Sequence, residues 1–130
     1  MPGILAVVLP QRGRLNSSAF ELLSAGRELA GKAGEPLWAA VLGSAASGLA
    51  QELVERGADK VFVLEDPAFE NLLDEAFAAA LGALAEAEKP SKILFASTVA
   101  GRSVAARLAV RLKAGLAADV AEFVSAGTGS

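Results

Sequence analysis

The chain has 130 residues, a net charge of −3 and 53% apolar residues, and it contains no cysteine, histidine or tyrosine. This length suits a single domain with a core of its own. The missing residue types exclude thiol nucleophiles, imidazole bases, tyrosyl acids and the usual zinc sites. The cations are scattered and no apolar run is long enough for a bilayer, which argues against nucleic-acid binding and membrane insertion. With no secretion signal, we expect a cytoplasmic protein without catalytic residues of its own.

The first half of the chain predicts two strand–helix units. The apolar run 3–10 is expected to form a central strand that ends near Leu9. Ser18 and Glu21 match a capping box at the start of a helix that fades by 31–34. A second buried strand is expected over 36–43. It is followed by a turn at 43–47 and by a helix over 48–56 that stops at Gly57.

The second half repeats the alternation. A short third strand is expected over 58–64, and Asp66-Pro67 then has the pattern of an N-cap followed by proline at the first helical position. A long, alanine-rich helix over 70–87 leads to a fourth buried strand that begins at Lys92. After Ser103 a helix runs to Gly115. A weaker fifth strand over 116–124 precedes a Gly/Ser/Thr tail over 125–130.

Strands that alternate with helices predict a three-layer α/β/α fold with a parallel sheet and right-handed crossovers. We expect five strands in a Rossmann-like 3-2-1-4-5 order, with residues 1–124 as one α/β domain and residues 125–130 as a flexible tail. This order places the first and fourth strands side by side. Segments 9–13 and 97–103 would then face each other across one crevice at the carboxyl edge of the sheet.

The turn between the fourth strand and the following helix is the main candidate binding site. Free backbone amides and the helix dipole favour an anion there, and Arg102 in the first helical turn predicts a nearby carboxylate or phosphate. In the functional interpretation, Ser97, Thr98, Gly101, Arg102 and Ser103 hold an anion or a nucleotide phosphate. In the structural interpretation, the hydroxyls cap the helix and Arg102 pairs with an acid of this chain or of a partner subunit. Gly101 serves close backbone packing in either case.

Other features also allow two interpretations. Arg107 and Arg111, four residues apart, could form a docking stripe for an acidic partner, although a solvated face near the helix C-terminus is favoured. Trp38 could stack on a flavin, but its apolar strand favours core packing. Segment 43–48 resembles a phosphate loop, yet it lacks the Gly-Lys-Ser/Thr ending of a P-loop.

Three aspartates lie at the ends of predicted elements or inside the last strand, namely Asp59, Asp66 and Asp119. Nothing in the sequence brings them together. Capping and turn formation account for Asp66 and Asp59, whereas Asp119 needs a partner or water. We therefore predict no catalytic residue and no metal site.

Three phrases, in this order, resemble the amino-terminal domain of the electron transfer flavoprotein α subunit: GADKVFV at 57–63, LFASTVAGRSVAARLA at 94–109 and GLAADV at 115–120. Together with the opening strand and the Asp66-Pro67 turn they cover nearly the whole chain. The resemblance implies an adenine-nucleotide-hydrolase-like α/β domain that acts as a scaffold in an electron carrier. Such a domain pairs with a β subunit, and the complete carrier passes electrons from acyl-CoA dehydrogenases towards a quinone reductase.

In that family the α subunit continues into a second domain that holds most of the FAD. The resemblance therefore implies FAD in the complete protein, bound by a carboxyl-terminal domain outside this chain, and no cofactor in the chain itself. The equivalent crevice of the β subunit holds AMP, whereas the α-subunit domain is not expected to hold a nucleotide. The alternative is a free-standing small nucleotide-binding protein that uses the crevice between the first and fourth strands. An independent hydrolase is disfavoured because histidine and cysteine are missing.

Overall fold

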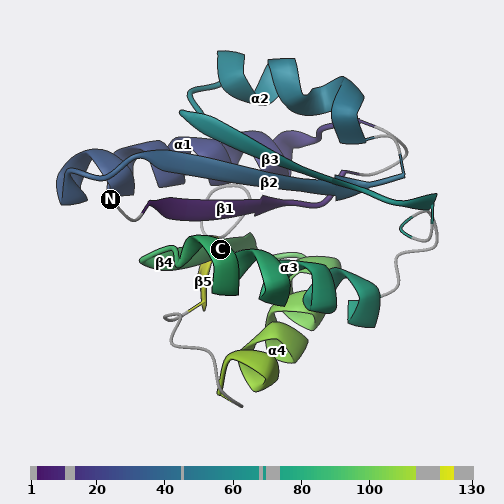
Figure 1. Cartoon of the computed structure of the whole chain (residues 1–130). Helices are drawn as coiled ribbons and strands as arrows, with labels where there is room; N and C mark the ends of the chain where they lie inside the picture. The colour runs from purple at the N-terminus through teal and green to yellow at the C-terminus, as the bar shows by residue number, and fades with distance from the viewer. Residues whose placement is uncertain are drawn as a thin grey trace.

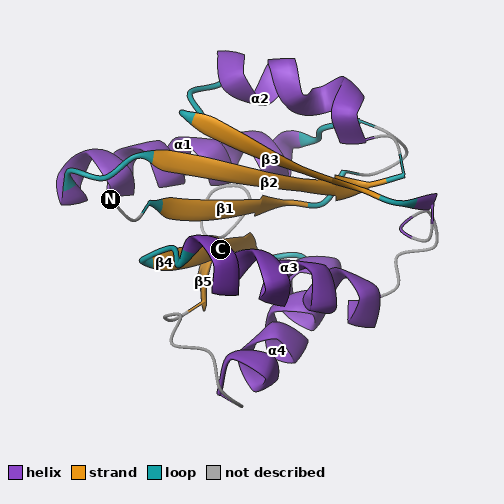
Figure 2. Cartoon of the chain, viewed as in Figure 1, coloured by secondary structure: helices purple, strands orange, loops and turns teal. Residues whose placement is uncertain are grey.

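Strands and helices alternate along the chain as predicted (Figure 2). The computed structural model describes residues 3–10, 14–44, 46–67, 69, 74–113 and 121–124. The strands are β1 (Ile4–Val8), β2 (Leu37–Gly43), β3 (Lys60–Glu65), β4 (Lys92–Ala96) and β5 (Ala121–Val124). The helices are α1 (Ser17–Ala33), α2 (Ala50–Glu55), α3 (Asp74–Glu88) and α4 (Val99–Lys113), and the 3₁₀ turn η1 (Ala46–Leu49) precedes α2.

The sheet has the order β3-β2-β1-β4-β5, and each neighbouring pair is parallel. Helices α1 and α2 lie on one side of the sheet and α3 and α4 on the other (Figure 1). This arrangement confirms the three-layer α/β fold with a parallel sheet and the predicted placement of the first strand beside the fourth. The body of the sheet is made by β1 to β4. The described part of the last strand is four residues long, and residues 116–120 of the predicted strand lie outside the described residues.

Strand β1 is the centre of the core because all five of its residues are buried. Leu5 and Val7 belong to the cluster under α3 and α4, which also contains Phe77 and Phe95. The other residues of β1 belong to the cluster under α1 and α2. Burial on both sides of the strand explains why its sequence is an unbroken apolar run rather than an alternating one.

Asn16 caps α1. Its Oδ1 atom accepts a hydrogen bond from the Ala19 N–H over 3.1 Å, and the helix begins at Ser17. The predicted capping box of Ser18 and Glu21 is wrong, because it would require α1 to begin two residues later. The helix ends at Gly34 in the left-handed conformation, with φ of 69°, in agreement with the predicted fading of the helix at 31–34.

Gly57 has a φ of 110° just after α2, which confirms the predicted stop. The Asp66 carbonyl accepts a hydrogen bond from the Phe69 N–H over 2.9 Å, so the chain turns at Asp66-Pro67. Residues 68 and 70–73 lie outside the described residues, and α3 is described from Asp74 onwards.

Candidate functional site

Only two residues separate the end of β4 at Ala96 from the start of α4 at Val99, so the helix begins earlier than the sequence predicted. Val99 is its first residue, so Ser103 lies inside the helix and not before it. The Oγ1 atom of Thr98 accepts a hydrogen bond from the Gly101 N–H over 3.0 Å. Thr98 thus satisfies one of the amide donors at the helix start that an anion would otherwise bind.

Gly101 is required by the close approach of α4 to the end of β4. A Cβ atom at this position would lie 2.2 Å from the carbonyl oxygen of Ala96 and 3.1 Å from Oγ1 of Thr98. No L-residue fits there without a backbone shift. This contact confirms that Gly101 serves close backbone packing.

The other polar side chains of the turn also have partners within the chain. The Nη2 atom of Arg102 donates a hydrogen bond to Oγ of Ser97 over 2.5 Å. The hydroxyl of Ser103 hydrogen-bonds the Asp74 carboxylate and so joins α4 to the first turn of α3. These contacts fit the structural interpretation of the turn, in which its hydroxyls organise the start of α4. Anion binding by the turn stays a prediction.

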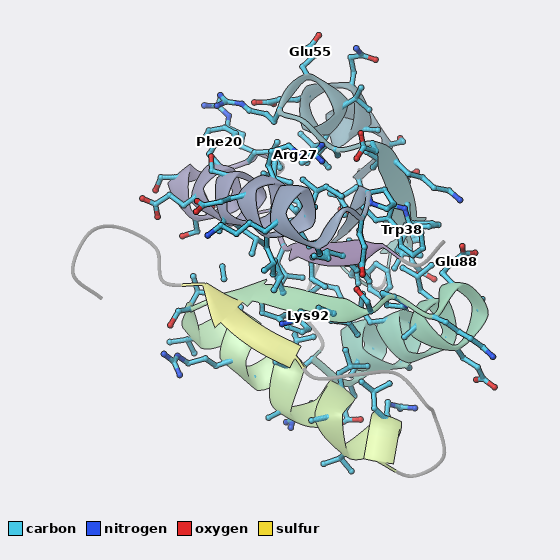
Figure 3. The ribbon with its side chains drawn as sticks, turned by 90° about the vertical axis from the view of Figure 1, so that its left-hand side faces the viewer. Phe20, Arg27, Trp38, Glu55, Glu88 and Lys92 are labelled. Carbon is cyan, nitrogen blue, oxygen red and sulfur yellow. The ribbon has the colours of Figure 1, made fainter. Side chains whose placement is uncertain are left out.

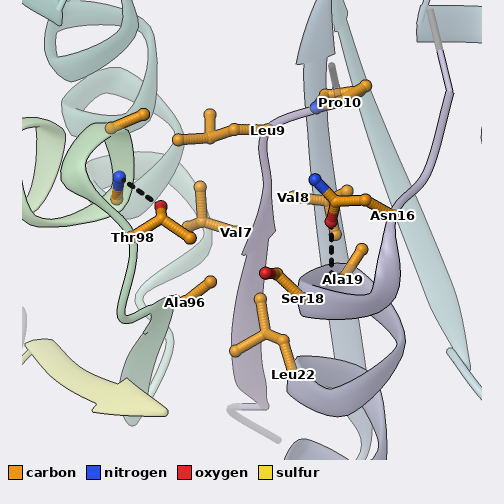
Figure 4. A pocket seen from close by; sticks show the side chains of 12 residues that line it. Val7, Val8, Leu9, Pro10, Asn16, Ser18, Ala19, Leu22, Ala96 and Thr98 are labelled. Carbon is orange, nitrogen blue, oxygen red and sulfur yellow. Dashed lines mark hydrogen bonds between the residues drawn. The ribbon is translucent and has the colours of Figure 1, made fainter. Parts of the chain in front are cut away.

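A small pocket lies where the carboxyl ends of β1 and β4 meet the starts of α1 and α4 (Figure 4). Leu9 and Pro10 line one side, and Thr98 and Gly101 line the other, so the predicted crevice is present among the described residues. Its volume of about 40 Å³ has room for a few water molecules. Sites for drug-sized ligands start at about 300 Å³. The described pocket is thus smaller than such sites, while residues 11–13 of the predicted crevice lie outside the described residues.

Segment 43–48 binds a carboxylate of its own chain. The Ser47 N–H donates a hydrogen bond to Oε1 of Glu65 over 2.8 Å. This hydrogen bond, joined by one from the Ser47 side chain, holds the pKa of Glu65 below its ordinary value. Glu65 was not among the residues predicted to form a site. The available signal was its place at the end of β3, in register with Gly43 at the end of β2, because parallel neighbours end at the same edge of a sheet.

Arg107 and Arg111 both contact one carboxylate of α3. Their guanidinium groups lie 3.3 and 3.9 Å from the two carboxylate oxygens of Glu75. Both arginine side chains are close to half exposed, at 44% and 45%. The favoured interpretation as a purely solvated face is therefore incomplete, since these side chains also bridge α4 to α3.

Trp38 packs in the core, as favoured from the sequence. It is 8% exposed, and its ring meets that of Phe62 edge to face with centroids 5.7 Å apart. A Cβ atom at Gly3 would lie 2.6 Å from the indole, so the glycine gives Trp38 its space. A side chain so enclosed is not available to stack on a flavin.

Asp59 organises the start of β2. Its Oδ2 atom accepts hydrogen bonds from the Leu37 N–H over 2.8 Å and from Nη1 of Arg27 over 3.2 Å. The hydrogen bond from Leu37, followed by the contact with Arg27, lowers the pKa of Asp59. Figure 3 shows Arg27 between α1 and α2. At the same pair of helices, the guanidinium carbon of Arg56 lies 3.7 Å from the centroid of the Phe20 ring.

The three aspartates singled out in the sequence do not form a site. Asp59 precedes β3 and Asp66 follows it, so the length of that strand separates them. Asp119 lies outside the described residues. Within the described ranges, no group of three or more acidic side chains gathers to hold a metal ion, and no polar or charged side chain is buried. Nor does this part of the chain contain a helix with the length and apolar character needed to cross a membrane.

The family model of the electron transfer flavoprotein domain matches residues 4–129. The chain is 39% identical to the electron transfer flavoprotein subunit alpha of Syntrophomonas wolfei, over 99% of this chain and 40% of that protein. It is 39% identical to the lactate dehydrogenase (NAD(+),ferredoxin) subunit LctC of Acetobacterium woodii, over 90% of this chain and 28% of that protein. It is also 39% identical to the acryloyl-CoA reductase electron transfer subunit beta of Anaerotignum propionicum, over 84% and 30% of the two chains.

Among solved structures, a universal stress protein in complex with cAMP has the same fold. The TM-score is 0.60 at 20% identity, covering 98% of this chain and all of that one. A universal stress protein from Archaeoglobus fulgidus gives a TM-score of 0.59 at 13% identity, over 98% of this chain and 99% of that one. The chain spans between 28% and 40% of the length of the curated relatives named above. With the family match over nearly all of its residues, the chain belongs to the electron transfer flavoprotein family, with the domain type of the α subunit's amino-terminal part.

Proposed function

We propose that this chain is the supporting domain of an electron carrier whose flavin is bound by other polypeptide. In this proposal the domain pairs with an electron transfer flavoprotein β subunit, and FAD lies in the complete α subunit outside these 130 residues. The observation that carries the proposal is the match of the electron transfer flavoprotein domain to residues 4–129, in a chain that is 39% identical to an electron transfer flavoprotein subunit alpha. The small volume of the described pocket, about 40 Å³, is consistent with this role.

The residues of the domain support this role by their arrangement. The turn at 97–103 is engaged in helix capping, in packing against Ala96 and in the contact with Asp74. We propose that its task is structural, and that the domain contributes shape and surface to the carrier rather than chemistry. A cytoplasmic location also remains part of the proposal.

For the complete carrier we propose acyl-CoA dehydrogenases as electron donors. One relative, at 39% identity, is named as the electron transfer subunit of an acryloyl-CoA reductase, an enzyme of acyl-CoA chemistry. Another, at the same identity, is a subunit of a lactate dehydrogenase, so the donor differs among relatives.

The test is purification of the chain alone and together with the β subunit encoded in the same genome. Alone, the chain should be colourless, and mixed with the β subunit it should elute from a gel-filtration column as a complex. A yellow chain with flavin absorption bands, or separate elution of the two proteins, would contradict the proposal. The proposed donor is tested by mixing the complete carrier with a purified, reduced acyl-CoA dehydrogenase. Reduction of the carrier is measured as the loss of its flavin absorbance.

A further inference from the structure

Helix α4 has apolar residues on two opposite sides. On its inner side, Val104, Leu108 and Leu112 are buried in the core. On its outer side, Val99 is 88% exposed and Val110 is 69% exposed, more than any other large apolar side chain of the described residues. They stand eleven residues apart, which is about three helical turns, so they lie on one side of the helix. A surface helix of an isolated domain is normally polar on that side.

The outer face of α4 consists of Val99, Arg102, Ala106 and Val110, spaced by three or four residues, and all four are exposed. Figure 1 shows α4 at the margin of the molecule. Single exposed apolar side chains are ordinary on protein surfaces, but two valines and an alanine aligned along one side of a surface helix form an apolar stripe of the kind found in protein interfaces.

The charge of α4 indicates which kind of surface would cover this face. The helix carries four basic residues and no acidic one, although the whole chain has a net charge of −3. Two carboxylates of α3 face this helix, because Arg107 and Arg111 share that of Glu75 and Ser103 hydrogen-bonds that of Asp74, so the four basic residues of α4 outnumber the acidic groups in these contacts. Electrostatic complementarity therefore favours a surface that combines apolar side chains with carboxylates.

We propose that the outer face of α4 is the docking surface for the β subunit, which would present an apolar patch bordered by Asp and Glu side chains. This inference rests on the proposed function, because it names the surface used in the pairing proposed above. The excess of arginines on α4 would steer and orient the acidic partner, and Val99 and Val110 would be buried in the contact.

The experiment compares two matched substitutions in the whole chain. Val110→Glu places a charge within the proposed contact, and Val54→Glu makes the same change on α2, where Val54 is 49% exposed on the other side of the sheet. Titration calorimetry with the purified β subunit should show binding weakened at least about tenfold by Val110→Glu and by less than about twofold by Val54→Glu. Arg102→Glu should also weaken binding, and raising NaCl from about 0.05 M to about 0.5 M should weaken it for the unchanged chain.

Circular dichroism of each variant checks that the fold is kept. Hydrogen exchange of the unchanged chain, with and without the β subunit, adds a measurement that needs no variant, and α4 amides should gain protection. If the β subunit binds the unchanged chain and Val110→Glu equally well, the inference is overturned while the pairing stands. If it binds neither, the pairing itself fails and the inference with it. Self-association of the unchanged chain that Val110→Glu abolishes would assign the face to a second copy and also overturn the inference.

Discussion

Glu65, at the end of β3, accepts a hydrogen bond from the Ser47 amide across 2.8 Å, and this contact joins the loops that follow two neighbouring strands. A carboxylate of the chain thus lies at a loop whose glycines and serines resemble those of an anion-binding loop. The internal contact satisfies an amide that would otherwise be open to an external anion.

The contact with Ser47 makes the loop sensitive to acid. The pKa of Glu65 is lowered in the folded chain, so the stability it contributes is present above the unfolded-state value of about 4.3 and is lost as the pH falls through the lower folded-state value. We expect the Ser47 amide resonance to titrate with Glu65 below pH of about 4.3. Glu65→Gln should abolish that titration. Glu55→Gln is the control, because the Glu55 carboxylate contacts the Gln51 side chain rather than a backbone amide; an unchanged titration curve in Glu65→Gln would contradict the assignment.

Two glycines of the described helices respond in opposite ways to the same substitution. Gly101→Ala drives a methyl group to within 2.2 Å of the Ala96 carbonyl oxygen, and we expect it to destabilise the fold by about 2 to 4 kcal/mol. Gly31→Ala meets nothing within 4 Å in an exposed part of α1 and should stabilise it by about 0.5 to 1 kcal/mol. Urea unfolding of both variants measures the difference. Equal stability of the two variants would show that α4 does not approach β4 as described.

The fold was predictable because its main determinants are local. Buried parallel strands appear as apolar runs, their alternation with helices fixes the class, and Gly57 and Gly34 mark helix ends through backbone conformations that other residues rarely adopt. The site was less predictable, because its contacts are made between distant segments. Glu65 at the end of β3 hydrogen-bonds Ser47, which follows β2, and Arg107 on α4 pairs with Glu75 on α3. No spacing rule in the sequence encodes such pairs.

The start of α1 shows how local rules compete. Asn16 and Ser18 are both good capping residues, and the sequence alone favoured Ser18 through its spacing to Glu21. The structure uses Asn16, whose Oδ1 accepts from the Ala19 N–H.

This competition predicts unequal effects for two neighbouring substitutions. Asn16→Ala removes the side-chain cap of α1 and should cost about 1 kcal/mol of unfolding free energy. Ser18→Ala lies within the helix and should change stability by less than about 0.5 kcal/mol. The stabilities of the two variants are compared by thermal unfolding at neutral pH. A larger loss for Ser18→Ala would restore the capping box and contradict the observed helix start.

Asp59 provides a test at the edge of the sheet where β2 and β3 begin. Leu37 is fully buried, and its amide depends on the Asp59 carboxylate, so Asp59→Ala should cost about 1 to 2 kcal/mol. Asp59→Asn keeps an acceptor and should cost less.

The contribution of Asp59 to stability should also depend on pH. The pKa of Asp59 is lowered, so this contribution is present above pH of about 3.9 and disappears as the pH falls through the folded-state pKa. Glu28→Ala is the control, since its exposed pair with Lys32 should be worth less than about 0.5 kcal/mol. Comparable losses for Asp59→Ala and Glu28→Ala would refute the role of Asp59.

The crevice between β1 and β4 should not bind AMP. The pocket of about 40 Å³ is lined largely by apolar and small residues, and two of its polar side chains, Asn16 and Thr98, already accept hydrogen bonds from helix-start amides. A phosphate bound at these helix-start amides would have to displace both caps. Titration calorimetry with AMP should therefore show no binding tighter than about 1 mM. AMP binding tighter than about 1 mM would contradict this prediction, and the domain would then be a nucleotide-binding protein rather than a scaffold. If Thr98→Ala made that binding stronger still, the Thr98 cap would be shown to compete with the ligand.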